Sequence, residues 1–405
     1  MTKSHHLRLS DLRGLGRLAS DATVGLTDLV EALHHTIGQT PGVLGTAPAG
    51  RTKGITGFVY RSVRGVTRAV GSSVDSLLGV LPPLIAEKRS SQEREAIVAA
   101  LNGVLGDYLV ASGNPLAIAM RLRASGIPLV VDRAQLRTAI PQPGRNVVVL
   151  LHGLCMNDLQ WKREEHDHGA ALALDLGYTP LYLHYNTGLR IAANGREFAD
   201  LMAVLMNEWP HPIERLAIVG HSMGGLVARS AIHYAALAGH AWPQRLDDLV
   251  FLGTPHCGAP LERAGARTDF LLGISPYTAP FARLGRIRSA GIKDLANGNL
   301  RDDTGKGRLG AGPQANDSVP LPEGVRCFAI AASRQQQAST GTRARGDGLV
   351  PVASALGLHR DPSRSLALPE NRRRIEYGIG HFDLLSNRSV YERIRSWLVF
   401  DRDTT

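Results

Sequence analysis

The sequence contains few of the residues that cross-link a small fold. Its three cysteines, Cys155, Cys257 and Cys327, lie far apart among 405 residues. Their odd number excludes a complete disulfide framework, and their spacing does not match that of zinc ligands. We therefore expect no metal site and a reducing compartment.

Long hydrophobic runs are also missing. No stretch approaches the roughly 18 to 20 uncharged apolar residues that a membrane-spanning helix requires. The first twenty residues, MTKSHHLRLSDLRGLGRLAS, lack the apolar centre and the small-residue cleavage site of a secretory signal. The sequence thus predicts a cytoplasmic protein with neither a signal peptide nor a transmembrane segment.

Aromatic residues make up only 5% of the chain, whereas the net charge is +10. Residues 1–140 hold 16 Lys and Arg against 10 Asp and Glu, and so carry +6 of that charge. Because these basic residues are not interleaved with stacking aromatics, we expect no nucleic-acid partner. The length and the 43% hydrophobic content favour two folded parts, a helical N-terminal region over 1–140 and a catalytic domain over 141–405.

The N-terminal region shows the helical period. Apolar residues recur every three or four positions from Leu12 to Ile37 and again from Ile55 to Leu81, where a Pro-Pro pair follows. The second helix, over 54–81, also presents a basic face. Two roles remain open for it, namely packing against the protein body, which such stripes favour, and peripheral contact with an anionic membrane surface.

After Pro143 the pattern changes to short apolar runs that alternate with helical segments. The run Asn146–Leu151 is continuously apolar and β-branched, as in a strand buried on both faces of a parallel sheet. The alternation predicts an α/β fold, with a mostly parallel central sheet and helices on both of its faces. Further strands are expected at 180–185, 216–219, 249–252 and 327–331, and helices at about 166–177, 192–208, 223–238 and 383–399.

One predicted strand runs directly into the sequence Gly220-His221-Ser222-Met223-Gly224, and a predicted helix follows. The pattern G-x-S-x-G is weak alone, but a strand-turn-helix setting is what a nucleophile elbow requires. Side chains in place of Gly220 and Gly224 would collide with the sharp turn. The motif therefore predicts Ser222 as a nucleophile.

A serine hydroxyl needs a base and an orienting acid, and in this arrangement both follow the serine along the chain. His381 lies between the last apparent strand and the C-terminal helix, where the base is expected. Asp347, between two glycines and soon after the 327–331 strand, is the expected acid. Asp383 competes with Asp347, but a residue two positions beyond the histidine is poorly placed to reach its far nitrogen.

A tetrahedral intermediate also needs two backbone donors. The N–H of Met223, directly after the nucleophile, is the first expected donor. The second is the N–H of Leu154, in the loop after the strand at 146–151. Cys155 and Cys257 are expected to flank the same cleft, but the order of residues argues against either as nucleophile.

With these residues in hand, the chain resembles the α/β-hydrolase superfamily, in its lipase and esterase branch, and is similar to the GPI inositol-deacylase-like domain. The resemblance rests on LLHGLCMN at 150–157, VGHSMGGLVAR at 219–229, LGTPHCGAP at 252–260, GDGLVP at 346–351 and GHFDLL at 380–385. It implies cofactor-free hydrolysis of an acyl ester or lipid, and a lid inserted at about 258–324. GPI deacylation does not carry over, because the chain lacks the membrane spans of that enzyme.

The sequence leaves two other functions open. An acyltransferase would use the same acylated serine and deliver the acyl group to an alcohol or thiol. A catalytically silent α/β-hydrolase would only bind its ligand, although the complete set of serine, acid and histidine argues against this. Residues 1–140 lie outside all the matching motifs, so the resemblance predicts nothing about them.

Overall fold

The computed structural model describes residues 9–39, 61–69, 72, 92–259, 289–302, 319–336 and 345–399. The chain divides into two compact units. The first comprises Met1–Arg94 with Leu109–Ala117, and the second comprises Glu95–Tyr108 with Ile118–Thr405. Compactness does not establish which part folds independently, so a domain boundary near residue 140 stays a prediction.

The first unit contains α1 (Leu9–Gln39) and both ends of α3 (Gln92–Ala111), which confirms a helical N-terminal region. Within it, the guanidinium of Arg94 binds the carboxylate of Asp11 at 2.7 and 2.5 Å. Residues 61–69 are helical, but most of the basic run 54–81 lies outside the described residues. No helix in the described ranges combines the length and the apolar character needed to cross a membrane.

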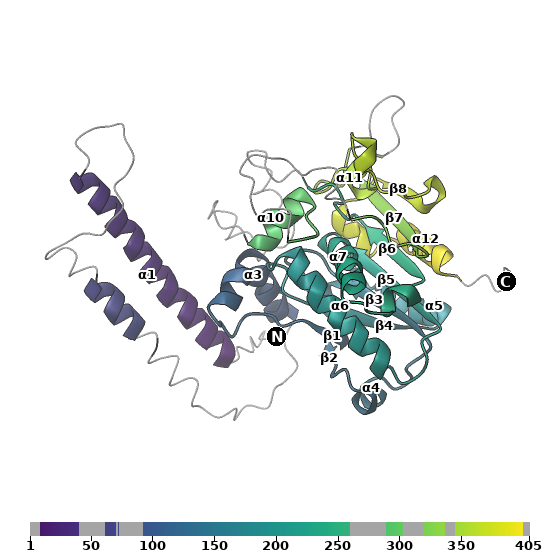
Figure 1. Ribbon diagram of the computed structural model, residues 1–405, viewed down its shortest axis with the longest axis horizontal. Helices are drawn as coiled ribbons and strands as arrows, with labels where there is room; N and C mark the ends of the chain where they lie inside the picture. The colour runs from purple at the N-terminus through teal and green to yellow at the C-terminus, as the bar shows by residue number, and fades with distance from the viewer. Residues whose placement is uncertain are drawn as a thin grey trace. The chain divides into compact units, whose positions relative to one another are not determined.

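The second unit is built on an eight-stranded sheet with the order β2-β1-β4-β3-β5-β6-β7-β8 (Figure 1). The six strands from β4 to β8 in this order run parallel, whereas β1 pairs antiparallel with both β4 and β2. Their bounds are β1 Arg121–Ala124, β2 Ile127–Pro128, β3 Asn146–Leu151, β4 Tyr178–His184, β5 Arg215–His221, β6 Asp248–Leu252, β7 Arg326–Ser333 and β8 Arg373–Tyr377.

Helices cover both faces of this sheet, because the central strands are apolar on both sides. Along β3, Val147 and Val149 belong to the core beneath α6 and α7, whereas Val148 and Leu150 belong to the core beneath α5 and α12. The helices are α4 Arg133–Ala139, α5 His168–Leu176, α6 Ile191–Glu208, α7 Met223–Leu237, α10 Ala290–Asn297, α11 Val352–Ala355 and α12 Arg388–Leu398. Together with the sheet order, this arrangement is the α/β-hydrolase fold.

The five predicted strands and the predicted helices of the second unit are confirmed, with ends that differ by a few residues. The sequence did not predict β1, β2 or β8. Each of these lies at an edge of the sheet or next to one, and β1 and β8 carry charged residues, so neither has the continuous apolar pattern of a central strand.

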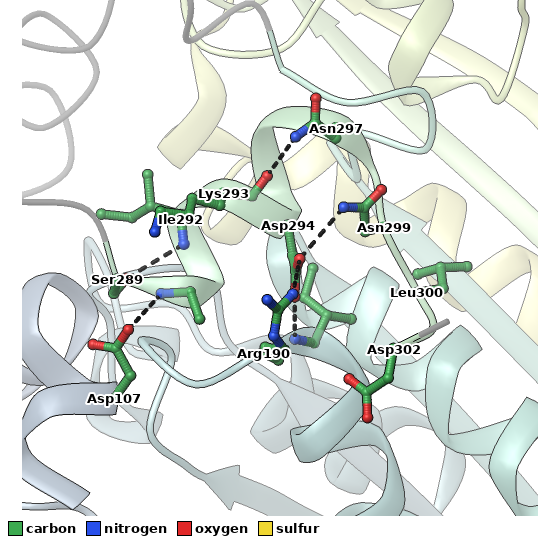
Figure 2. Close-up of polar contacts among 12 residues, drawn as sticks. Asp107, Arg190, Ser289, Ile292, Lys293, Asp294, Asn297, Asn299, Leu300 and Asp302 are labelled. Carbon is green, nitrogen blue, oxygen red and sulfur yellow. Dashed lines mark hydrogen bonds and ion pairs between the residues drawn. The ribbon is translucent and has the colours of Figure 1, made fainter. Parts of the chain in front are cut away.

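Part of the predicted lid, 260–288 and 303–318, lies outside the described residues. The stretch 289–302 between these two ranges contains α10, which is anchored through Asp294 (Figure 2). The Asp294 carboxylate accepts the backbone N–H of Ile191 at 3.1 Å, at the first residue of α6, and pairs with Arg190 at 3.2 Å. Asp294 therefore caps the N-terminus of α6, because Arg190, the N-cap residue of this helix, makes no side-chain capping hydrogen bond. A lid function for the insertion stays a prediction.

Candidate active site

Ser222 occupies a sharp turn between the end of β5 and the start of α7. Its backbone has φ 54° and ψ −121°, a strained conformation for a residue with a side chain, and its N–H donates to the carbonyl of Leu252 at 2.8 Å. A Cβ on Gly224 would come within 3 Å of the Leu151 carbonyl, and one on Gly220 would collide with the backbone of Gly225. The two glycines thus allow the tight turn that projects Ser222 from the carboxyl edge of the sheet.

Asp347 and His381 lie together at the same edge, in the loops that follow β7 and β8. His381 Nδ1 is 2.7 Å from Asp347 Oδ2, and both side chains are buried. The other carboxylate oxygen, Oδ1, accepts the N–H groups of Leu349 and Val350, each at 2.8 Å. Burial alone would raise the pKa of the Asp347 carboxyl, but His381 and the two N–H donors hold this pKa below its ordinary value.

The imidazole of His381 packs against His221, the residue that precedes Ser222. The two rings lie 4.7 Å apart between centroids, and His221 Nε2 is 3.2 Å from the backbone carbonyl of His381. No hydrogen bond joins the Ser222 hydroxyl to His381 within the described residues. Such bonds are often long before substrate binds.

A second histidine holds the short 3-10 turn η7 (His381–Leu385) at its other end. His168 Nε2 lies 2.8 Å from the carbonyl of Leu384, and His168 Nδ1 lies 2.8 Å from His166 Nε2. Burial lowers the pKa of His168 to about 4, so at neutral pH its Nε2–H can donate while its bare Nδ1 accepts from His166. No sequence pattern indicates this role, because His168 lies more than 200 positions from the turn that it contacts.

The loop after β3 approaches the nucleophile closely. A Cβ on Gly153 would lie 3.1 Å from Ser222 Cβ, and the N–H of Met156 donates to the carbonyl of Gly153, which closes a turn over Gly153–Met156. We call this the oxyanion turn. Within the described part of the chain, neither the N–H of Leu154 in this turn nor the N–H of Met223 at the start of α7 donates a hydrogen bond.

Two residues that sequence analysis did not identify hold the oxyanion turn, and both follow β4. The hydroxyl of Tyr185 donates to the carbonyl of His152 at 2.7 Å, and the hydroxyl of Thr187 accepts the N–H of Cys155 at 3.0 Å. Their position directly after a buried strand, at the carboxyl edge of the sheet, was the signal that could have found them.

Asp383, the competing acid, has another partner. Its Oδ2 accepts the N–H of Gly380 at 2.8 Å, so it caps the turn that carries His381. In the described ranges no group of three or more His, Cys, Asp or Glu side chains is arranged to hold a metal ion. The groups that the structure describes at this edge of the sheet are a hydroxyl, an imidazole, a carboxylate and backbone N–H groups.

Fold and site together define an α/β-hydrolase-fold protein in which a sharp strand-turn-helix junction carries Ser222. Residues 142–278 match one family model, described as the PGAP1-like alpha/beta domain. No curated protein matches the chain.

Several solved structures are similar to the chain. The mature form of the Bacillus licheniformis lipase BlEst2 matches with 19% identity and a TM-score of 0.42, over 64% of this chain and 94% of that one. The Pyrococcus furiosus esterase Pf2001 matches with 13% identity and a TM-score of 0.39, over 63% and 80%. An Enterococcus faecalis alpha/beta hydrolase superfamily protein matches with 17% identity and a TM-score of 0.39, over 62% and 89%. The function argued below rests on the residues of this chain.

Proposed function

We propose that the protein is a serine hydrolase of carboxylic esters, with Ser222 as nucleophile, His381 as base and Asp347 as the acid that orients the base. The observation that carries this proposal is the buried hydrogen bond between His381 and Asp347, at the edge of the sheet where the strained elbow presents Ser222. A histidine held in this way has a fixed ring orientation, and its proton on Nδ1 leaves Nε2 free to act as a base.

In the proposed reaction, Ser222 Oγ attacks the ester carbonyl carbon while His381 Nε2 removes the hydroxyl proton. The carbonyl oxygen becomes an oxyanion, which the N–H groups of Leu154 and Met223 stabilise. His381 then returns its proton to the departing alcohol, and an acyl-enzyme remains on Ser222. Water, activated by the same imidazole, attacks the acyl-enzyme and releases the acid. No cofactor is required in this sequence of steps.

The substrate class that fits this chemistry is a small acyl ester or a lipid. Peripheral membrane contact through the basic run 54–81, one of the two roles that the sequence leaves open for it, would suit a lipid substrate.

The test is covalent labelling with a fluorophosphonate, together with hydrolysis of p-nitrophenyl esters of graded chain length. We expect the wild-type protein to be labelled and to release nitrophenol, and Ser222→Ala to do neither. Absence of labelling in the folded wild-type protein would leave only a binding role. Products analysed with and without an added alcohol or thiol separate hydrolysis from acyl transfer.

A further inference from the structure

We propose that the part of α3 within the second unit, Glu95–Tyr108, fixes the backbone of the oxyanion turn, and that Gly103 and Thr187 are positioning residues for the reaction. This inference rests on the proposed function. It gives a role in catalysis to a helix that lies outside the matching motifs, before the first strand of the sheet.

The first observation is the contact between α3 and Cys155. A Cβ on Gly103 would come within 3 Å of both Sγ and Cα of Cys155, so this helix position must lack a side chain. Cys155 itself is buried and has φ 58°, a conformation that favours glycine. A strained residue persists only where its surroundings hold it in place, and Gly103 provides the space that its side chain occupies.

This contact bears on the chemistry because Cys155 directly follows Leu154, whose N–H is the proposed oxyanion donor. The peptide that joins Leu154 and Cys155 lies at the centre of the oxyanion turn, so a shift of Cys155 moves the Leu154 N–H with it. A hydrogen bond to a developing charge weakens steeply with distance and angle. The packing of Cys155 against α3 therefore determines the position and direction of the Leu154 N–H.

The second observation is that α3 also holds the loop that contributes Thr187. Asn186 Nδ2 donates to the carbonyl of Gly106 at 3.1 Å, and a Cβ on Gly188 would collide with the carbonyl of Asn102. Thr187 lies between these two contacts, and its hydroxyl accepts the N–H of Cys155. The oxyanion turn is thus fixed by α3 directly and through this loop.

The third observation is that residues at the start of α10 and directly before it make hydrogen bonds to α3. Ser289 Oγ donates to the carbonyl of Gly103 at 2.7 Å. The N–H of Ala290 donates to Asp107 Oδ2 at 2.9 Å (Figure 2). The N–H of Gly291 donates to the carbonyl of Gly188 at 3.0 Å. The helix α3, the loop 186–188 and α10 are thus joined by hydrogen bonds, and together they hold the oxyanion turn.

The first test is Gly103→Ala, measured by ester hydrolysis. We expect kcat to fall by about tenfold or more with KM nearly unchanged, because the displaced donor acts on the transition state. The rate of fluorophosphonate labelling should fall in parallel. The matched control is Gly16→Ala, also inside a helix, where an added Cβ meets nothing within 4 Å. Activity of Gly103→Ala within twofold of wild type would overturn the inference.

A suppressor variant shows whether the loss comes from the contact with Cys155. Cys155→Gly removes the sulfur atom, the closest of the atoms that the new methyl group would strike, and leaves the milder approach to the Cα atom at 2.9 Å. Glycine also accepts the positive φ of this position. The double variant Gly103→Ala/Cys155→Gly should be more active than Gly103→Ala alone. A double variant no more active than the single one would contradict a route through Cys155.

If Gly103→Ala fails to fold, variants of Thr187 test the inference instead. Thr187→Val keeps the side-chain shape but removes the hydroxyl that accepts the Cys155 N–H, and Thr187→Ser restores a hydroxyl. We expect Thr187→Val to lose kcat without a change in KM, and Thr187→Ser to recover most of it. Equal activities of the two variants would overturn the inference. Failure of the proposed function is distinct, because then the wild-type protein itself is neither labelled nor active.

Discussion

His381 Nδ1 lies 2.7 Å from Asp347 Oδ2, in a buried contact between two loops that are 34 positions apart in the sequence. Asp347→Asn keeps the shape of the acid but presents an amide, so the histidine loses its charged partner and its preferred tautomer. We expect kcat for ester hydrolysis to fall by roughly 10² to 10⁴-fold. The measurement is steady-state hydrolysis of a p-nitrophenyl ester, with the fold checked by circular dichroism.

The matched control for this variant is Asp383→Asn, two residues beyond the histidine. Asp383 accepts the Gly380 N–H, which the carbonyl group of an asparagine also accepts, so we expect activity within a few fold of wild type. If Asp383→Asn lost more activity than Asp347→Asn, the acid would have been assigned to the wrong residue.

The nucleophile elbow should not tolerate a methyl group at Gly224. A Cβ there would come within 3 Å of the Leu151 carbonyl, which is backbone and cannot rotate away. We expect Gly224→Ala to abolish fluorophosphonate labelling and to lower the free energy of unfolding by about 1 to 3 kcal/mol. Full labelling of this variant at wild-type stability would show that the turn relaxes, and that its close packing is not required.

As the pH falls, the protein should lose stability at pH values well above those at which carboxylates are protonated. Burial lowers the pKa of His152 to about 3 and of His168 to about 4, so both are neutral in the folded protein at pH 5. The unfolded chain binds protons at these residues below about pH 6.5. Stability therefore falls as pH falls from about 6.5 towards 4, by up to about 1.4 kcal/mol per pH unit for each histidine.

This dependence is measurable by urea unfolding at several pH values between 4.5 and 7.5. His168→Gln removes one of these buried histidines, so the slope of unfolding free energy against pH should fall by about one proton. An unchanged slope would mean that His168 is protonated in the folded protein. Asp347 affects stability in a lower pH range. Its pKa is lower in the folded protein than in the unfolded chain, so its ionised carboxylate stabilises the fold above about pH 4. This contribution is lost as the pH falls through the pKa of the folded protein.

The anchoring of α10 predicts a difference between two aspartates of the stretch 289–302, Asp294 and Asp302, which are both labelled in Figure 2. Asp294 is buried and caps α6, so Asp294→Ala leaves the Ile191 N–H without an acceptor and should cost about 1 to 3 kcal/mol. Asp302 pairs with Arg196 at the surface, so Asp302→Ala should cost about 0 to 1 kcal/mol. Urea unfolding measures both costs, and equal costs would contradict the capping role.

The main strands could be predicted because their residues allow few alternatives. The run Asn146–Leu151 is apolar at nearly every position, and only a strand covered on both faces buries such a run in a sheet. The strand β8, with the sequence RRIEY, contains three charged and two apolar residues, and it lies at the edge of the sheet, where none of its residues is fully buried. Its pairing with β7 depends on a neighbour that local sequence does not reveal.

The sequence by itself determined five strands of the sheet, the turn that carries Ser222 and the order in which Ser222, Asp347 and His381 follow one another, because these depend on local pattern and on the direction of the chain. Only the tertiary structure decided that Gly103 packs against Cys155 and that His168 reaches the turn of His381, since these pairs are distant in sequence. Such contacts depend on close packing in the folded core, which brings together residues from distant parts of the chain. The space left by the absent side chain of Gly103 is filled by Cys155, and a ring nitrogen of His168 binds the carbonyl of Leu384.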